Sequence, residues 1–433
     1  MQESSAVKTR IDGSPTRTRK GLIGAGIGNA LEWFDWLIYA QFSLILATQF
    51  FPSGNPAAAL LSTLAVFGAG FLFRPLGGYL LSTVTDRKGR RAGMVATITL
   101  MAGGTLLIGI APTYTQVGLV APVLLIVARM CQGMSAGGEF ATVSSYLAEV
   151  APAGKRGLYS SVLYISSTVG SLAATGLALL LHALLDDGQM HSWGWRIPFL
   201  LGALVGLVAM FLRRNMDETE AFVVSSESKP KRENGLVILL RHHRADFVRL
   251  LLISGLSGLW YYVFASYLPV YMIGQGLDSN DALLASVISL VGFILVLPAV
   301  AVFSDRYGRR LLIIAFTGLA AATVIPIFLL LDATFARQVT LQLGALLIFA
   351  LFAAVGPIAM AEQFPTEIRA VGLGVPYSIG VAIFGGTAPF LIEWLSSLDR
   401  MWIFPLYVAT LSVCTLVATL SMRDRRTADI SEI

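Results

Sequence analysis

The chain of 433 residues is 55% hydrophobic and only 13% charged, with a mean hydropathy of +0.72. Because soluble domains usually carry about 25% charged residues, this composition excludes an ordinary soluble enzyme and predicts an integral membrane protein. The net charge of +5 does not indicate a nucleic-acid partner, since in a membrane protein the positions of the basic residues matter more than their sum. The two cysteines, Cys131 and Cys414, lie in separate apolar runs and give no support to a disulfide framework.

Twelve apolar runs are long enough to cross a membrane, which takes about 20 residues for a ~30 Å hydrocarbon layer. The first six are expected near 22–49, 57–82, 93–111, 118–148, 158–184 and 195–213. The second six are expected near 247–274, 281–303, 311–331, 338–362, 370–396 and 401–422. The predicted fold class is an all-α membrane protein with two six-helix bundles, 22–213 and 247–422, and with tails at 1–21 and 423–433.

The polar segment 214–246 joins the two bundles. Its composition is that of an ordinary linker, so we interpret it as a cytoplasmic tether with short helices; a regulatory or lipid-binding segment is the alternative.

The positions of Lys and Arg predict which side of the membrane each connection faces. Arg337 and Arg400 lie in connections that would be outside, and Arg74, Arg129 and Arg196 lie within helices or at their ends. The other basic residues lie in the tails or in alternate connections. We therefore expect a multi-pass membrane protein with both termini in the cytoplasm.

A charged loop motif occurs twice, half a chain apart. The loop at 86–91 reads DRKGRR and the loop at 305–310 reads DRYGRR. A second motif, ExxPxxxR, begins at Glu149 after the first loop and at Glu362 after the second. These paired repeats indicate that the two halves are related to each other.

The two loops resemble those between the second and third, and the eighth and ninth, helices of the major facilitator superfamily. In that family the Asp and Arg of each loop latch neighbouring helices on the cytoplasmic side in the outward-open state. The family has Gly four residues before the Asp, where this chain has Ser82 and Ala301. A simple basic anchor with solvated acids is the alternative. The resemblance predicts a cytoplasmic gate formed by Asp86, Arg87, Arg90, Glu149, Arg156, Asp305, Arg306, Arg309, Glu362 and Arg369.

The first helix carries two acidic residues in the middle of its span. Glu32, Asp35 and Tyr39 are spaced so that they share one helix face. Carboxylates are costly inside a membrane, so we expect Asp35 and Glu32 to face a polar cavity and to carry protons. The alternative is a pair of structural carboxylates satisfied by neighbouring helices.

Arg129 in the fourth helix is the expected counterpart of Asp35, because both lie well inside the membrane at compatible depths. Protonation of Asp35 would free Arg129 to hold a substrate carboxylate, and deprotonation would reclaim it. Tyr39 and Gln132 are predicted to complete this site. Glu139 lies about 15 Å farther along the helix, and we assign it to the cytoplasmic gate or a proton exit.

Other polar residues are weaker candidates for substrate binding. Arg74 is a possible second anion ligand, and its alternatives are snorkelling or pairing with Glu32 or Glu139. Arg196 is either an entry site for anions or an aromatic-belt anchor. Tyr261, Tyr262 and Tyr377 are candidate cavity residues, with helix packing as the alternative.

Four motifs together resemble the metabolite:proton symporter family, a branch of the major facilitator superfamily. They are NxxEWFD at 29–35, RPxGG at 74–78, QGxSxGGE at 132–139 and WGWRIPF at 193–199. Within that family, the segment FFPSGN at 50–55 and the chain length are most like the members that take up α-ketoglutarate and citrate. The resemblance implies the major facilitator fold, a place in a bacterial cytoplasmic (inner) membrane, and proton-driven uptake of a di- or tricarboxylate by alternating access.

Three other functions remain open at this point. The chain could carry another metabolite, such as shikimate, an aromatic acid or a betaine- or proline-like osmolyte. It could be a receptor that binds a metabolite without moving it, or it could mediate uncoupled diffusion or efflux. No phosphate loop is present to support ATP-driven transport. We expect no enzyme activity, no cofactor and no metal; the expected partners are a small organic anion, protons and the lipid bilayer, and the chain is expected to work as a monomer.

Overall fold

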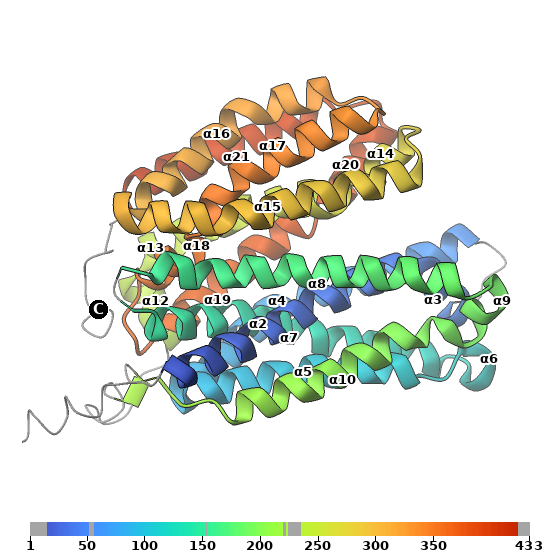
Figure 1. Cartoon of the computed structure of the whole chain (residues 1–433), viewed down its shortest axis with the longest axis horizontal. Helices are drawn as coiled ribbons and strands as arrows, with labels where there is room; N and C mark the ends of the chain where they lie inside the picture. The colour runs from blue at the N-terminus through green and yellow to red at the C-terminus, as the bar shows by residue number, and fades with distance from the viewer. Residues whose placement is uncertain (1–14, 52–55, 153, 220–221, 224–234, 423–433) are drawn as a thin grey trace, which may run out of the picture.

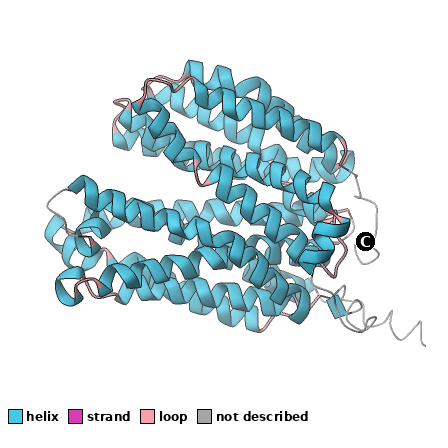
Figure 2. Cartoon of the chain, turned by 180° about the vertical axis from the view of Figure 1, so that it is seen from behind, coloured by secondary structure: helices cyan, strands magenta, loops and turns pink. Residues whose placement is uncertain are grey.

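A computed structural model describes residues 15–51, 56–152, 154–219, 222–223 and 235–422. In these ranges the regular elements are all helices (Figure 2). Ten helical segments are long and apolar enough to cross a membrane. Two further long helices pack along them. The first is α2 (Pro15–Gln41), which α3 (Ser43–Phe50) continues, and the second is α4 (Pro56–Lys88). The predicted all-α class with twelve long helical segments is therefore confirmed.

The first bundle continues from α4 through four more long helices. These are α5 (Arg90–Ile110), α7 (Val120–Val150), α8 (Arg156–Leu184) and α10 (Arg196–Arg214). The short elements α6 (Tyr114–Val117), α9 (Asp187–Gln189) and the π-helix η1 (Met190–Gly194) connect them. The first helix begins at Pro15, before the expected residue 22, because a helix that leaves the membrane can continue into a polar tail with Pro at its first position.

The second bundle begins after a short helix, α12 (Gly235–His242). Its helices are α13 (Arg244–Tyr261), η2 (Tyr262–Tyr267), α14 (Leu268–Gly274), α15 (Ser279–Tyr307), α16 (Arg309–Leu330), α17 (Phe335–Ala353), α18 (Gly356–Ala361), α19 (Arg369–Gly380), η3 (Val381–Gly385), α20 (Ala388–Ser397) and α21 (Ile403–Leu420). Three segments expected as single helices are broken, and each break lies close to a proline, namely Pro269, Pro357 and Pro389. Proline cannot donate a helical hydrogen bond and its ring clashes with a preceding carbonyl.

The two bundles repeat one packing scheme, which explains the paired motifs. In the first bundle α2 packs on α8, α4 on α7, and α5 on α10. In the second bundle α13 packs on α19, α15 on α17, and α16 on α21. In each half the first long helix thus pairs with the fifth, the second with the fourth, and the third with the sixth.

The bundles meet mainly at one end of the molecule. We call it the loop end because it carries the two repeated charged loops, around Gly89 and Gly308. There α19 contacts α4 and α7, and α15 contacts α8. Figure 1 shows the ribbons of the two bundles diverging toward the opposite end, the far end, where α3 and α14 lie.

Glycines bring α4 and α7 into backbone contact, and this contact fixes the helices that carry the charged residues of the first bundle. A Cβ on Gly133 would lie 2.0 Å from the carbonyl oxygen of Gly70, and a Cβ on Gly137 would lie 2.0 Å from that of Arg74. Small residues permit such close approach between membrane helices.

Replacing Gly137 with Ala is therefore expected to lower the thermal unfolding midpoint in detergent clearly, because the Arg74 backbone must move away from the new methyl group. Overpacking of this kind usually costs about 1–3 kcal/mol. Gly103→Ala is the matched control, since nothing lies within 4 Å of its Cβ position in α5. Ala is the better helix former, so this control should be neutral or slightly stabilising. Equal losses in both variants, measured by intrinsic fluorescence, would contradict the contact argument.

Candidate functional site

A polar cluster lies inside the first bundle, about a third of the way along α7 from the far end. Arg129 Nη1 is 3.4 Å from Asp35 Oδ2, and the two side chains are fully buried. Thr105 in α5 donates to Asp35 Oδ1 at 2.7 Å, and Gln132 Nε2 donates to the Thr105 hydroxyl at 3.1 Å. Arg129 Nη1 also donates to Gln132 Oε1 at 2.7 Å. Three helices therefore hold one carboxylate and one guanidinium in contact.

Aromatic rings enclose the guanidinium of Arg129. Its Cζ lies 4.3 Å from the centre of the Trp36 ring and 4.2 Å from that of the Tyr39 ring. Cation–π contacts of this kind stabilise a cation that has lost water. The hydroxyl of Tyr39 donates to the carbonyl of Thr63 in α4 at 3.1 Å. The structure thus brings Asp35, Tyr39, Arg129 and Gln132 together as the sequence predicted.

A second charged pair lies one helical turn along α2 toward the loop end. Arg74 Nη2 is 3.8 Å from Glu32 Oε1, and both side chains are buried. The Arg74 guanidinium lies over the Phe71 ring at 4.6 Å and the Trp36 ring at 4.7 Å. Of the interpretations left open for Arg74, the pairing with Glu32 is therefore the one that the structure shows.

Aromatic residues of the second bundle face these pairs across the interface. Trp33 of α2 lies 4.9 Å from Tyr261 and 5.7 Å from Tyr262, measured between ring centres. Tyr377 stacks on Phe140 of α7 at 3.6 Å. Tyr261, Tyr262 and Tyr377, all from the second bundle, therefore lie at the contact between the bundles.

Glu139 is satisfied within the first bundle. Both of its carboxylate oxygens pair with Arg213 of α10, and Oε2 also accepts a hydrogen bond from Thr97 at 2.5 Å. A Cβ on Gly28 would lie 1.9 Å from Arg213 Nη2, so the missing side chain makes room for the guanidinium. The described contacts of Glu139 hence join helices of one bundle, rather than the two bundles.

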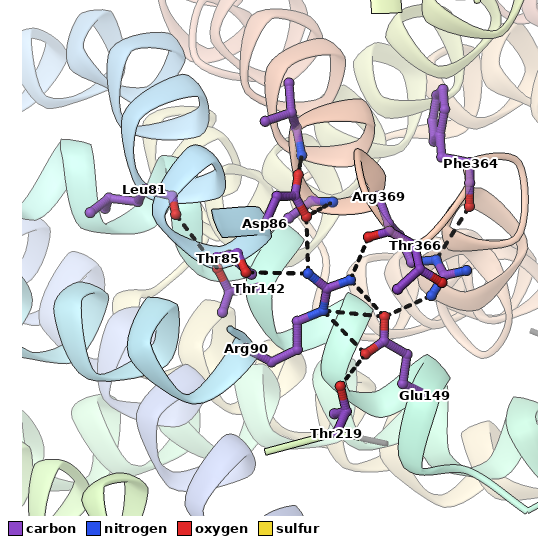
Figure 3. Close-up of polar contacts among 12 residues, drawn as sticks. Leu81, Thr85, Asp86, Arg90, Thr142, Glu149, Thr219, Phe364, Thr366 and Arg369 are labelled. Carbon is purple, nitrogen blue, oxygen red and sulfur yellow. Dashed lines mark hydrogen bonds and ion pairs between the residues drawn. The ribbon is translucent and has the colours of Figure 1, made fainter. Parts of the chain in front are cut away.

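Arg90 is the centre of a buried network at the loop end (Figure 3). Its Nη1 lies 3.0 Å from Asp86 Oδ1 and its Nη2 lies 2.7 Å from Glu149 Oε1. Glu149 Oε1 is also 2.6 Å from Arg369 Nη1, which belongs to the second bundle. Arg90 Nη2 in addition donates to the carbonyl of Thr366 at 2.9 Å.

Asp86 binds the first turn of α19 in the other bundle. Its two oxygens accept hydrogen bonds from the backbone N–H groups of Ala370, at 3.1 Å, and Val371, at 2.8 Å. Free N–H groups and the helix dipole favour a carboxylate at a helix N-terminus.

The second copy of the motifs makes the reciprocal contacts. Asp305 Oδ1 accepts a hydrogen bond from the backbone N–H of Gly157 at the start of α8, at 2.9 Å. Glu362 pairs with Arg309 of its own bundle and, at 3.3 Å, with Arg156 of the first bundle. We use the name latch for the Asp86–Arg90–Glu149–Arg369 network together with Arg156, Asp305, Arg309 and Glu362.

Three of the predicted residues lie away from these clusters. Arg87 and Arg306 are exposed at the loop end. Arg196 lies near the far end, where it donates to the carbonyl of Ala111 at 2.9 Å and stacks on Trp195 at 4.2 Å.

Two residues after α10 contact the latch and were not predicted. The carboxylate of Glu218 accepts hydrogen bonds from the backbone N–H groups of Arg90, at 2.8 Å, and Arg91, at 3.2 Å. Thr219 is buried and donates to Glu149 Oε2 at 2.5 Å (Figure 3). The only sequence signal was an acidic run directly after the sixth helix of the first bundle.

Comparisons with known proteins agree with this architecture. Residues 25–375 match the Major Facilitator Superfamily. The chain is 36% identical to the alpha-ketoglutarate permease of Escherichia coli (strain K12), over 98% of this chain and 99% of that protein. It is 33% identical to the citrate-proton symporter of Klebsiella pneumoniae, over 97% of this chain and 95% of that protein.

A solved structure shares the fold at much lower sequence identity. The proton:xylose symporter XylE from E. coli, bound to 6-bromo-6-deoxy-D-glucose, superimposes with a TM-score of 0.83 at 16% identity, covering 96% of this chain and 98% of that one. The family match covers most of the chain, and the two relatives align over nearly their full length. The chain therefore is a transporter-type membrane protein that belongs to the major facilitator superfamily, in the metabolite:proton symporter branch that its sequence motifs resemble.

Proposed function

We propose that the chain is a proton-coupled symporter that imports a small organic anion, most simply a di- or tricarboxylate such as α-ketoglutarate or citrate. The observation that carries this proposal is the buried Asp35–Arg129 pair, held by Thr105 and Gln132. An ionisable pair inside a membrane bundle is costly and usually functional. The names of the alpha-ketoglutarate permease, at 36% identity, and of the citrate-proton symporter, at 33%, support a carboxylate substrate. Other relatives, at 33–34% identity, are named putative proline/betaine transporters and support the osmolyte alternative.

The pair supplies a direct coupling mechanism. When Asp35 is ionised it neutralises Arg129, and an incoming anion would meet a guanidinium that is already paired. When Asp35 takes up a proton, its charge is lost and Arg129 becomes available to a substrate carboxylate. Because a buried charge without a partner is strongly unfavourable, proton and anion are expected to bind together. Glu32 and Arg74 form a second pair that would extend the same exchange toward the loop end.

We propose that Tyr261, Tyr262 and Tyr377 complete the substrate site from the second bundle. They lie at the bundle interface, next to Trp33 and Phe140 of the first bundle. A site shared between the bundles would change its exposure when the bundles rock against each other, which is the alternating-access mechanism of such folds.

The latch is proposed to close the cytoplasmic side. By the positive-inside rule, we propose that the basic loop end and both termini lie in the cytoplasm and that the chain resides in a bacterial cytoplasmic membrane. With the latch formed, a substrate could reach the proposed site only from outside. All of the proposed residues belong to one chain, which supports the proposal that a monomer carries out transport.

Uptake by the purified protein in proteoliposomes tests the proposal. The panel contains α-ketoglutarate, citrate, shikimate, an aromatic acid, proline and betaine, each with and without an inwardly directed proton gradient. Accumulation of a di- or tricarboxylate that depends on the gradient supports the proposal. If only proline or betaine accumulates, the substrate belongs to the alternative class of osmolytes. Equilibration of a substrate without accumulation contradicts proton coupling.

A further inference from the structure

The seventh long helix changes its hydrogen-bond pattern where it passes the bundle interface. Between α13 and α14, residues Tyr262–Tyr267 form the π-helix η2. The backbone N–H of Leu268 donates to the carbonyl of Val263, five residues earlier. The corresponding donor for the carbonyl of Phe264 would be residue 269, which is a proline without an N–H. The Phe264 carbonyl therefore has neither of its usual backbone donors, because the N–H of Leu268 pairs with Val263 and Pro269 has no N–H.

Gln342 of α17 supplies the missing donor. Its Nε2 donates to the Phe264 carbonyl at 2.8 Å, and the side chain is fully buried. Its Oε1 accepts hydrogen bonds from the hydroxyl of Ser286 in α15, at 3.1 Å, and from Gln338 Nε2, at 3.2 Å. Because two neighbours fix the oxygen, the amide is oriented with its N–H group toward Phe264.

The same face of α17 contacts the seventh helix on the other side of this break. Trp260 Nε1 donates to the carbonyl of Ala345 at 2.9 Å, and the ring of Phe349 lies 5.3 Å from that of Tyr261. Figure 1 shows α15 and α17 in the second bundle, and α15 also contacts α8 of the first bundle. The described hydrogen bonds of Gln342, however, all go to residues of the second bundle. Gln342 thus acts on the seventh helix from behind, without touching the first bundle in any described contact.

The π-helix begins at Tyr262, the second residue of the tyrosine pair. A π turn places its residues differently around the helix axis than an α turn does, so the register of η2 sets the direction of the neighbouring side chains. Tyr261 and Tyr262 are consecutive, and both contact the ring of Trp33.

We propose that Gln342 is a positioning residue: by hydrogen-bonding the Phe264 carbonyl it holds η2 in its π register and thereby fixes Tyr261 and Tyr262 against the first bundle. The substrate-related part of this inference rests on the proposed function, whereas the backbone part does not. Gln342 touches no residue proposed to bind the proton, so its loss would affect substrate recognition through the tyrosines and leave the coupling pair intact.

The test is Gln342→Met, which keeps the side-chain volume and removes the donor. Hydrogen–deuterium exchange of the amides in 262–268 is expected to become about tenfold faster, because a buried carbonyl without a partner is strongly unfavourable. The KM of the substrate identified in the uptake panel is expected to rise by about the same factor, with a smaller change in Vmax. A merely structural role would lower the amount of active protein, and hence Vmax, without changing KM.

Ser289→Ala is the control. Ser289 is also fully buried in the second bundle, but its hydroxyl donates to the carbonyl of Ala285 within the regular helix α15, and it makes no described contact with Gln342. This variant should leave both the exchange at 262–268 and the KM unchanged. Equal effects of Gln342→Met and Ser289→Ala on exchange or KM would overturn the proposal.

Two further variants keep the proposal testable if Gln342→Met folds poorly. Ser286→Ala removes one donor to Gln342 Oε1 and should change exchange and KM in the same direction, by a smaller factor. Adding Pro269→Ala to Gln342→Met restores a backbone N–H near Phe264, and exchange protection should return toward that of the wild type. If protection does not return, the orphaned carbonyl is not the cause. These exchange measurements need no transported substrate, so they remain decisive if the uptake panel fails.

Discussion

Asp35→Asn is expected to abolish substrate accumulation driven by a proton gradient and to preserve counterflow exchange of the substrate. Asn has the shape and the neutrality of a protonated Asp, so Arg129 remains available to an anion at every pH. No proton is then carried, and the gradient can no longer drive uptake. The measurement is uptake into proteoliposomes with an imposed gradient, compared with exchange of labelled for unlabelled substrate without one.

The same variant should also change the stability of the protein. Removing one partner of a buried ion pair commonly costs about 3–5 kcal/mol, because the other charge is left uncompensated. The thermal unfolding midpoint without substrate should therefore fall, and a saturating anionic substrate should recover much of the loss.

Asp281→Asn is the control for Asp35→Asn. Asp281 is exposed in the first turn of α15, so its replacement should change neither transport nor stability. Gradient-driven accumulation that remains intact in Asp35→Asn would overturn the assignment of the proton to Asp35.

Glu149→Gln is expected to open the cytoplasmic side. Glu149 is buried between Arg90 and Arg369, and without its charge these two guanidinium groups face each other across the bundle interface. The loss of about 3–5 kcal/mol from a buried pair is enough to reverse a two-state equilibrium between closed and open forms. Transport should slow strongly, since the cycle must return through the closed form.

Opening can be followed with a reporter cysteine at Ser82, which is fully buried and lies against α19 near Gly374. In a background with both native cysteines replaced by Ser, Ser82→Cys should react with maleimide at least tenfold faster when Glu149→Gln is present. Unchanged labelling would show that the latch does not hold the cytoplasmic side closed.

Two further variants control for the reporter measurement. Arg369→Gln in addition to Glu149→Gln removes the repulsion and should slow the labelling again, because Arg90 keeps Asp86 as its partner. Asp332→Asn breaks an exposed ion pair of 3.6 Å with Arg337 and should have no effect, since surface pairs contribute little.

The sequence predicted those parts of the molecule that follow from simple patterns. Membrane thickness sets the helix length, and the paired motifs at Glu149 and Glu362 predicted which charges meet at the loop end. The cost of burying charge indicated that Asp35 and Arg129 would find each other.

Other features depend on three-dimensional packing, which the sequence does not display. The sequence pattern assigned Arg213 to the basic connection after the sixth helix, but the space beside Gly28 lets its side chain turn inward to Glu139. Glu218 belongs to a segment with ordinary linker composition, and its contact with the N-terminus of α5 depends on the direction in which the chain leaves α10. Gln342 lies in an apolar helix, and its partner is a carbonyl whose loss of donors appears only once the π-helix is seen.

The reciprocity of the latch bears on how such a chain could arise. Asp86 binds the N-terminus of α19 while Asp305 binds that of α8, and Glu149 meets Arg369 while Glu362 meets Arg156. In a two-fold symmetric dimer, residue i of one subunit contacts residue j of its partner, and residue j of the first subunit contacts residue i of the partner. The latch has this isologous form within one polypeptide. A single six-helix half could therefore make the whole latch with a second copy of itself, and gene fusion would keep every contact while freeing the two copies to diverge, as the charged first half and the aromatic second half have done.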